Sequence, residues 1–185
     1  MWRANNRNYI MKINIIFLVI YFIGFFAYAV DVTVNVNGEI LTQSCNVTGK
    51  DLIKNINFLV LNPSDFNQIG STSATQPISI HLENCSGKVN NMSYKFSGEE
   101  DDNDPTLLKI LGKANSLEGD IATGLAIEIL DKYRKKISLN TKYALNEVIT
   151  TPSYDLNFYL RYKSTQINIG SGDASSLLFL DIYYE

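Results

Sequence analysis

The sequence predicts an all-β fold, and three observations lead to this class. Short apolar runs are separated by clusters of turn residues along most of the chain. Beyond the first 29 residues, no segment of helix length has the apolar spacing of an amphipathic helix. The intervals between the runs suit the short strands of a β-sandwich.

The first 29 residues predict a signal peptide. Basic residues precede an apolar run and a small-residue cleavage site: Arg3, Arg7 and Lys12, then residues 13–26, then Ala27-Tyr28-Ala29. The run is shorter than the roughly 20 residues that span a bilayer. We expect cleavage after Ala29, which leaves enough chain for one domain. Translation could start at Met1 or at Met11 without changing the mature chain.

Charge and cysteine content describe an exported, acidic chain. Three of the 16 basic residues and none of the 19 acidic residues precede the cleavage site, so the mature net charge is −6. This charge argues against nucleic acid as a partner. Cys45 and Cys85 are an even pair in a chain that meets an oxidising compartment, so we expect one disulfide. Closing a loop of this length contributes about 4 kcal/mol in the chain-entropy model.

The expected strands follow one another along the chain. In the first, apolar Val32, Val34, Val36 and Ile40 alternate with polar residues. Gly38 occupies the remaining position on the apolar face and has no side chain. On pattern alone it could be an ordinary first strand, and residues 38–45 could continue as the first strand of the domain itself. The other apolar runs predict strands at residues 56–61, 78–82, 92–96, 107–111, 125–130, 154–162 and 177–184.

Two charged stretches are expected to form loops. Residues 131–136 predict the tip of a hairpin. The acidic residues 99–104 could in principle bind calcium, but they lack the ordered alternation of a calcium loop, and a solvated loop is the favoured interpretation.

The sequence gives little support to catalysis. His81 is the sole histidine and falls in an expected strand beside apolar neighbours, where a structural role is favoured. We find no nucleophile elbow, phosphate-binding loop or metal-ligand cluster. We therefore expect no enzyme activity, no cofactor and no metal.

Several segments resemble the fimbrial subunits of the chaperone-usher pathway, over essentially the whole mature chain. Residues 31–40 with Cys45 resemble the N-terminal region of minor tip pilins of type 1 fimbriae. The C-terminus is similar at two hallmark positions of subunits that a periplasmic chaperone recognises: Gly172 is fourteenth from the end and Tyr184 is penultimate. Further segments resemble the second-cysteine strand, the phenylalanine-glycine segment and a glycine-led strand that ends in aspartate: residues 77–85, 94–98 and 124–131.

The resemblance implies an incomplete immunoglobulin-like (pilin) β-sandwich that lacks its last strand. Residues 30–40 would be a donor-strand extension and residues 41–185 the pilin domain. A strand from a periplasmic chaperone would first fill the open groove, and the extension of the next subunit would replace it at the outer-membrane usher. The neighbours are other pilus subunits, and the route leads through the periplasm to a cell-surface fimbrium of a Gram-negative bacterium.

The C-terminal run has the pattern that such a groove needs. Leu178, Leu180, Ile182 and Tyr184 share one face by alternation, and we expect them to line the groove edge. An unpaired apolar strand invites aggregation, which gives a chaperone a reason to cover it. The terminal carboxylate of Glu185 is a plausible anchor for basic chaperone residues. An ordinary terminal strand is the alternative from the pattern alone.

The function predicted is that of a structural subunit of an adhesive pilus, assembled by donor-strand exchange. A minor or tip subunit is favoured because only 15 residues separate Ala29 from Cys45. A major shaft pilin, a pilus adhesin and a self-complete secreted immunoglobulin-like binding module are the alternatives. A chain that folds alone, without chaperone or donor peptide, would favour the last.

Overall fold

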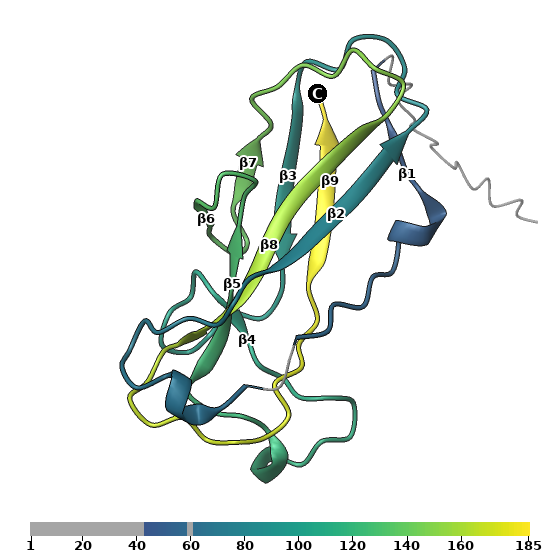
Figure 1. Cartoon of the computed structure of the whole chain (residues 1–185). Helices are drawn as coiled ribbons and strands as arrows, with labels where there is room; N and C mark the ends of the chain where they lie inside the picture. The colour runs from purple at the N-terminus through teal and green to yellow at the C-terminus, as the bar shows by residue number, and fades with distance from the viewer. Residues whose placement is uncertain (1–42, 59–60) are drawn as a thin grey trace, which may run out of the picture. The chain divides into compact units, whose positions relative to one another are not determined.

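The computed structural model describes residues 43–58 and 61–185, and its regular structure is almost entirely β-strand (Figure 1). Six strands in this part of the chain form one sheet in the order β1-β2-β8-β5-β4, with β6 also paired to β5. Their bounds are β1 Asn46–Val47, β2 Gln76–Glu83, β4 Leu108–Lys109, β5 Leu125–Leu130, β6 Lys136–Ile137 and β8 Tyr154–Ser164. The all-β class predicted from the sequence is confirmed.

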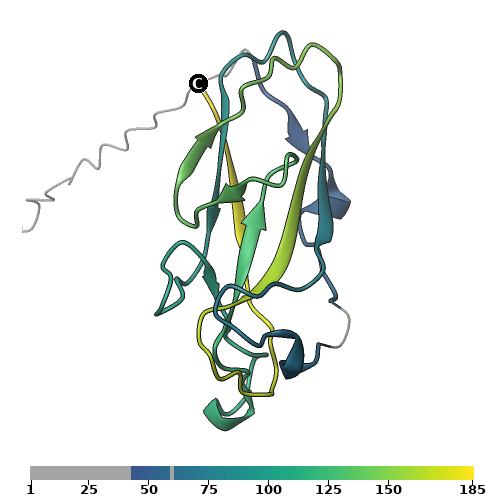
Figure 2. The same ribbon diagram turned by 60° about the vertical axis from the view of Figure 1, so that its left-hand side comes forward.

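A second, three-stranded sheet has the order β7-β3-β9. Its strands are β3 Met92–Ser97, β7 Lys142–Ala144 and β9 Phe179–Tyr184. Three short 3-10 helices lie in the connections: η1 Gly49–Asp51, η2 Pro63–Asp65 and η3 Glu118–Asp120. The turned view in Figure 2 shows β9 and β3 lying behind β5 and β8 of the larger sheet. No helix within the described residues is long and apolar enough to cross a membrane.

The core lies between the two sheets because the strands alternate in polarity. In β2, Ile78, Ile80 and Leu82 are buried, and β8 places a matching row of apolar side chains on the same face. The two strands are antiparallel, with Ile80 opposite Leu156. From β8, Phe158 contacts Phe96 of the smaller sheet, with ring centroids 4.8 Å apart.

Strand β5 is buried on both faces. One face carries Ile127 and Ile129 into the core. The other carries Glu128, whose buried carboxylate accepts hydrogen bonds from Arg161 Nε at 2.7 Å and Lys163 Nζ at 2.9 Å on β8. Burial opposes the charged form of Glu128, but these two cations outweigh it and lower its pKa.

The disulfide predicted from the sequence joins Cys45 to Cys85. It lies beside β1, whose Asn46 pairs with Glu83 at the end of β2. The covalent link therefore fixes the start of the described domain to the larger sheet.

Three of the strands expected from the sequence differ from those in the structure. Residues 56–58 and 61 form no strand, although Ile56, Phe58 and Leu61 pack against the core as the alternation predicted. The reason is that this segment has no neighbouring strand in the described chain. The strand expected at residues 107–111 shortens to Leu108–Lys109, and the last strand begins at Phe179 rather than at residue 177. The hairpin tip expected at 131–136 is confirmed between β5 and β6.

We predict that the domain loses stability at alkaline pH through its buried tyrosines. Burial raises the pKa of Tyr94 to about 12, and burial together with the hydrogen bond to Glu147 raises that of Tyr154 to about 12. The folded state keeps these phenols protonated while the unfolded chain ionises them near pH 10. Their contribution is therefore complete below pH 10 and is lost as the pH rises towards 12.

Urea unfolding at pH 8 to 11.5 measures this loss. Tyr94→Phe should flatten the decline, whereas the same change at the exposed Tyr133 should not. A stability that is constant up to pH 11.5 would contradict the prediction.

Candidate functional site

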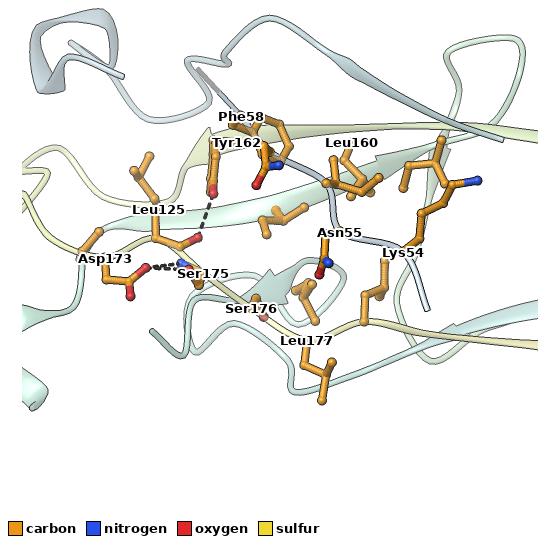
Figure 3. A pocket seen from close by; sticks show the side chains of 18 of the residues that line it. Lys54, Asn55, Phe58, Leu125, Leu160, Tyr162, Asp173, Ser175, Ser176 and Leu177 are labelled. Atoms are coloured by element: carbon orange, nitrogen blue, oxygen red, sulfur yellow. Dashed lines mark hydrogen bonds between the residues drawn. The ribbon is translucent and has the colours of Figure 1, made fainter. Parts of the chain in front are cut away.

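A groove of about 1220 Å³ runs along the domain between two backbone segments. One side is formed by residues 51–58 and 61–63, and the other by residues 169–182, which include most of β9. Figure 3 shows the groove with Lys54, Asn55 and Phe58 on the first side and Ser176 and Leu177 on the second. The side chains between the two segments are almost all apolar and come from five strands: Ile78, Ile80, Phe96, Leu108, Leu125, Ile127, Leu160 and Tyr162.

Strand β9 forms the C-terminal edge of the groove. It pairs with β3 along one side, in a register that sets Ile182 opposite Tyr94. On its other side no described strand pairs with it. Leu178, Leu180 and Ile182 are half-buried and line the groove, whereas Phe179 is 55% exposed. An edge of this kind, apolar and unpaired, is a template for another strand.

The opposite edge is the segment 52–58. Ile56 and Phe58 are half-buried while Asn55 and Asn57 are exposed, which is strand-like alternation. The described residues provide no backbone hydrogen bond to this segment. The unpaired edge of β9 and the segment 52–58 thus lie on opposite sides of an apolar floor. A strand laid between them could satisfy the backbone groups of both.

The loop before β9 is tied to the larger sheet by polar contacts. The hydroxyl of Tyr162 on β8 donates a hydrogen bond of 2.7 Å to the carbonyl oxygen of Ala174. The hydroxyl of Ser176 donates one of 2.5 Å to the carbonyl of Lys109. Asp173 accepts hydrogen bonds from Ser175 and from the backbone of Lys113, and these bonds lower its pKa. The start of the β9 edge is therefore fixed in place.

The other end of the edge is held by Tyr184. Its hydroxyl donates a hydrogen bond of 3.0 Å to the carbonyl oxygen of Cys45. Burial raises the pKa of this phenol. The bond connects the end of β9 to the disulfide and to the start of β1. The partner of Tyr184 could not be foreseen from the sequence, because it is a main-chain atom 139 residues away.

Gly172 lies where two loops touch through their backbones. A Cβ atom built on it would lie 2.6 Å from the amide nitrogen of Ala122, the carbonyl oxygen of Asp120 and the carbonyl carbon of Ile121. The neighbouring Asp173 exchanges backbone hydrogen bonds of 2.8 and 3.0 Å with Asp120 and Ala122. Glycine is needed here for close approach, which adds a structural role to the recognition role expected for it.

The remaining predicted site residues are Glu185 and those of the N-terminal segments. Glu185 is exposed, and its side chain contacts Lys142 of β7. The signal peptide at 1–29 and the donor strand, with Val32, Val34, Val36, Gly38 and Ile40, lie outside the described residues. Three contributors to the groove that the sequence did not single out are Asp51, Lys54 and Tyr162; nothing in their local sequence distinguishes them from ordinary strand or turn residues.

The described residues offer little for catalysis. The imidazole of His81 lies 2.6 Å from a carboxylate oxygen of Asp155 on the neighbouring strand. Asp101 in the acidic loop accepts hydrogen bonds from the backbone of Asn103 and Asp104, which is turn chemistry. Over residues 43–58 and 61–185, no group of three His, Cys, Asp or Glu side chains is placed to hold a metal ion.

The chain is similar in sequence to fimbrial proteins. The model of the family "Fimbrial protein" matches residues 34–185. The uncharacterized fimbrial-like protein YcbU of Escherichia coli (strain K12) is 32% identical over 155 residues, which are 83% of this chain and 84% of that protein. The fimbrial subunit type 1 of Salmonella typhimurium is 28% identical over 155 residues, 83% of this chain and 82% of its own.

The fold is similar to those of solved fimbrial and pilus subunits. An antigen and type I fimbria protein of Burkholderia pseudomallei is similar with a TM-score of 0.56 and 25% identity, over 76% of this chain and 88% of that one. The P pilus rod subunit PapA has a TM-score of 0.60 at 19% identity, over 76% of this chain and 99% of that one, and shows the likeness of fold.

We predict that Gly172→Ala destabilises the domain. The added methyl group meets backbone on three sides, which cannot move aside as a flexible side chain can. The free energy of unfolding should fall by about 1–3 kcal/mol, the usual range for overpacking. Urea unfolding of the mature chain measures the loss. Gly119→Ala is the matched control, since nothing lies within 4 Å of its Cβ position. Equal losses in both variants would contradict the assigned role.

We also predict that Tyr184→Phe lowers the free energy of unfolding by about 0.5–1.5 kcal/mol, the contribution of one hydrogen bond. The ring keeps its packing, and only the contact with Cys45 is lost. Tyr183→Phe serves as the control, because the ring of Tyr183 lies under Lys142 and keeps that contact without its hydroxyl. Chemical denaturation of both variants at pH 7 checks this, and unchanged stability of Tyr184→Phe would count against it.

Proposed function

This chain belongs to the fimbrial protein family, and we propose that its groove is the place where a donated β-strand completes the domain. The chain is a structural subunit of a pilus, and fimbrial proteins of this family are surface components of Gram-negative bacteria. The observation that carries the proposal is the apolar floor between two unpaired edges, 52–58 and β9.

The proposed donor is the extension at residues 30–40 of a neighbouring subunit. Its apolar side chains alternate with polar ones, so one face can fill the groove while the other meets solvent. Burying each Val or Ile contributes about 1.5–3 kcal/mol before the cost of ordering the strand. Hydrogen bonds to both edges would add orientation and register.

A periplasmic chaperone and an outer-membrane usher are the proposed assembly partners. The exposed apolar groove supports the need for a chaperone, because an uncovered edge of this kind aggregates. We propose that β9 with Tyr184 and the terminal Glu185 carries the contact with the chaperone. The chain would reach the periplasm through cleavage after Ala29 and leave it through the usher.

The type of subunit is proposed from the sequence. The short interval between Ala29 and Cys45 favours a minor or tip subunit. A major shaft subunit would instead dominate sheared pili, and an adhesin would carry a receptor-binding function. Membership of a family of structural subunits supports a structural role without enzyme activity.

The donor role is tested with synthetic peptides that cover residues 30–40. The wild-type peptide should bind a subunit whose own donor is disabled. A Val36→Asp peptide should bind about a hundredfold more weakly, because it buries a carboxylate without a partner. An Asn35→Asp peptide is the matched control, since it adds the same charge to the polar face.

The full-length Val36→Asp subunit should still bind chaperone, because the chaperone covers the groove and not the extension. It should fail to insert into the preceding subunit. If both charged peptides bound as tightly as the wild-type peptide, the donor assignment would lose its support.

A further inference from the structure

The ladder between β1 and β2 stops abruptly at Thr48. The amide of Thr48 donates a hydrogen bond of 3.1 Å to the carbonyl of His81. In a continuing antiparallel ladder, the carbonyl of Thr48 would accept the amide of His81 in return. It instead accepts the amide of Asp51 at 2.9 Å, which closes the turn of η1. The chain thus leaves the edge of β2 within one residue.

Beyond the end of β1, the side chains of Asp51 and Lys54 form hydrogen bonds with backbone groups at the edge of β2. A carboxylate oxygen of Asp51 accepts the amide of His81 at 2.7 Å, in the place of the Thr48 carbonyl. The other carboxylate oxygen accepts a hydrogen bond of 2.7 Å from Lys54 Nζ, which also donates to the carbonyl of Ser79. The side chain of Asp51 is only 6% exposed. The hydrogen bonds from Lys54 and from the His81 amide lower its pKa to about 2.

The edge of β2 therefore needs no further strand. His81 presents both its amide and its carbonyl to this edge, and Ser79 presents its carbonyl there, so odd-numbered residues face outward. Pro77 has the same parity and has no amide hydrogen to offer. Proline and charged side chains are the means by which edge strands are blocked.

The diverted chain becomes the second edge of the groove. Beyond Lys54, Ile56 and Phe58 pack against the core, and the ring of Phe58 lies 4.5 Å from that of Tyr162 between centroids. If residues 49–54 had continued along β2, the following segment would follow that sheet and not face β9. The position of this groove edge thus depends on the point where β1 ends.

We propose that Asp51 and Lys54 are positioning residues for strand donation: by occupying the edge of β2, they direct residues 52–58 to the groove as its second edge. This inference rests on the proposed function of the groove. In this inference, the contacts of two charged side chains determine where the chain leaves the edge of β2 and begins to line the groove.

Peptide binding and hydrogen exchange test the proposal together. The mature chain carries Val36→Asp in every sample, so that it does not donate its own strand, and the probe is the synthetic peptide of residues 30–40. Asp51→Ala and Lys54→Met remove the contacts with β2. Asp51→Asn keeps an acceptor for the His81 amide, and Lys54→Arg keeps a donor for Ser79. Lys50→Met is the control, a charge removed from the same turn.

We expect Asp51→Ala and Lys54→Met to weaken peptide binding by about tenfold or more, and the conservative and control variants by less than about threefold. The bound peptide should protect the amides of β9 in every variant. It should protect the amides of 52–58 in the wild-type, control and conservative chains, but not in Asp51→Ala or Lys54→Met. A general loss of folding would remove both protections together, so this pattern isolates one groove edge.

Wild-type affinity in Asp51→Ala and Lys54→Met, with residues 52–58 protected, would overturn the inference. Should Asp51→Ala fail to fold, Lys54→Met decides, since its side chain is 34% exposed and its removal leaves no large cavity. A wild-type chain that does not bind the peptide would overturn the donor-groove proposal itself, and this inference with it. If the wild-type chain and all variants bound the peptide with equal affinity, this inference would be overturned, while the donor-groove proposal would stand.

Discussion

The apolar floor between β9 and residues 52–58 is the feature on which the rest of the structure depends. A sandwich buries its core by covering each sheet with the other. Here the smaller sheet has three strands against six within the described chain, so part of the larger sheet is not covered by a strand of the smaller one. Side chains such as Ile80 and Ile127 line an open groove in consequence. The two groove edges do not close over this floor, because contacts outside the groove hold each of them in place.

The elements that the sequence predicted well are those whose pattern needs no partner to be recognised. The alternation of β2 and β8 and the continuous apolar run of β5 define their strands within a few residues. The disulfide was predicted from an even pair of cysteines and from the expected export of the chain, and the structure has it. The inward face of β9 followed from its period of two, although what that face does in assembly was an inference from resemblance and stays a proposal.

The parts that could not be predicted depend on contacts between distant segments. The alternation of Ile56, Phe58 and Leu61 predicted a strand, yet no described strand lies beside them, and a strand is defined by its neighbour as much as by its own residues. The two-residue strands β1 and β6 are too short for periodicity to detect. The contact of Gly172 with the backbone of Asp120, Ile121 and Ala122 is equally invisible in the sequence, because turn glycines look alike until their surroundings are known.

The two edges of the groove are held by different kinds of interaction, and this difference has a physical origin. β9 is paired along its length with β3. Tyr162 holds the loop before it through Ala174, and Tyr184 holds its C-terminal end through Cys45. Residues 52–58 have side-chain anchors alone in the described structure, at Lys54 and at Phe58. A segment that must pair with an incoming strand has to keep its backbone groups free, so packing and charge must hold it where a ladder cannot. The residues that hold the second edge are therefore side chains that contact β2 and β8, and they leave the backbone that faces the groove unpaired.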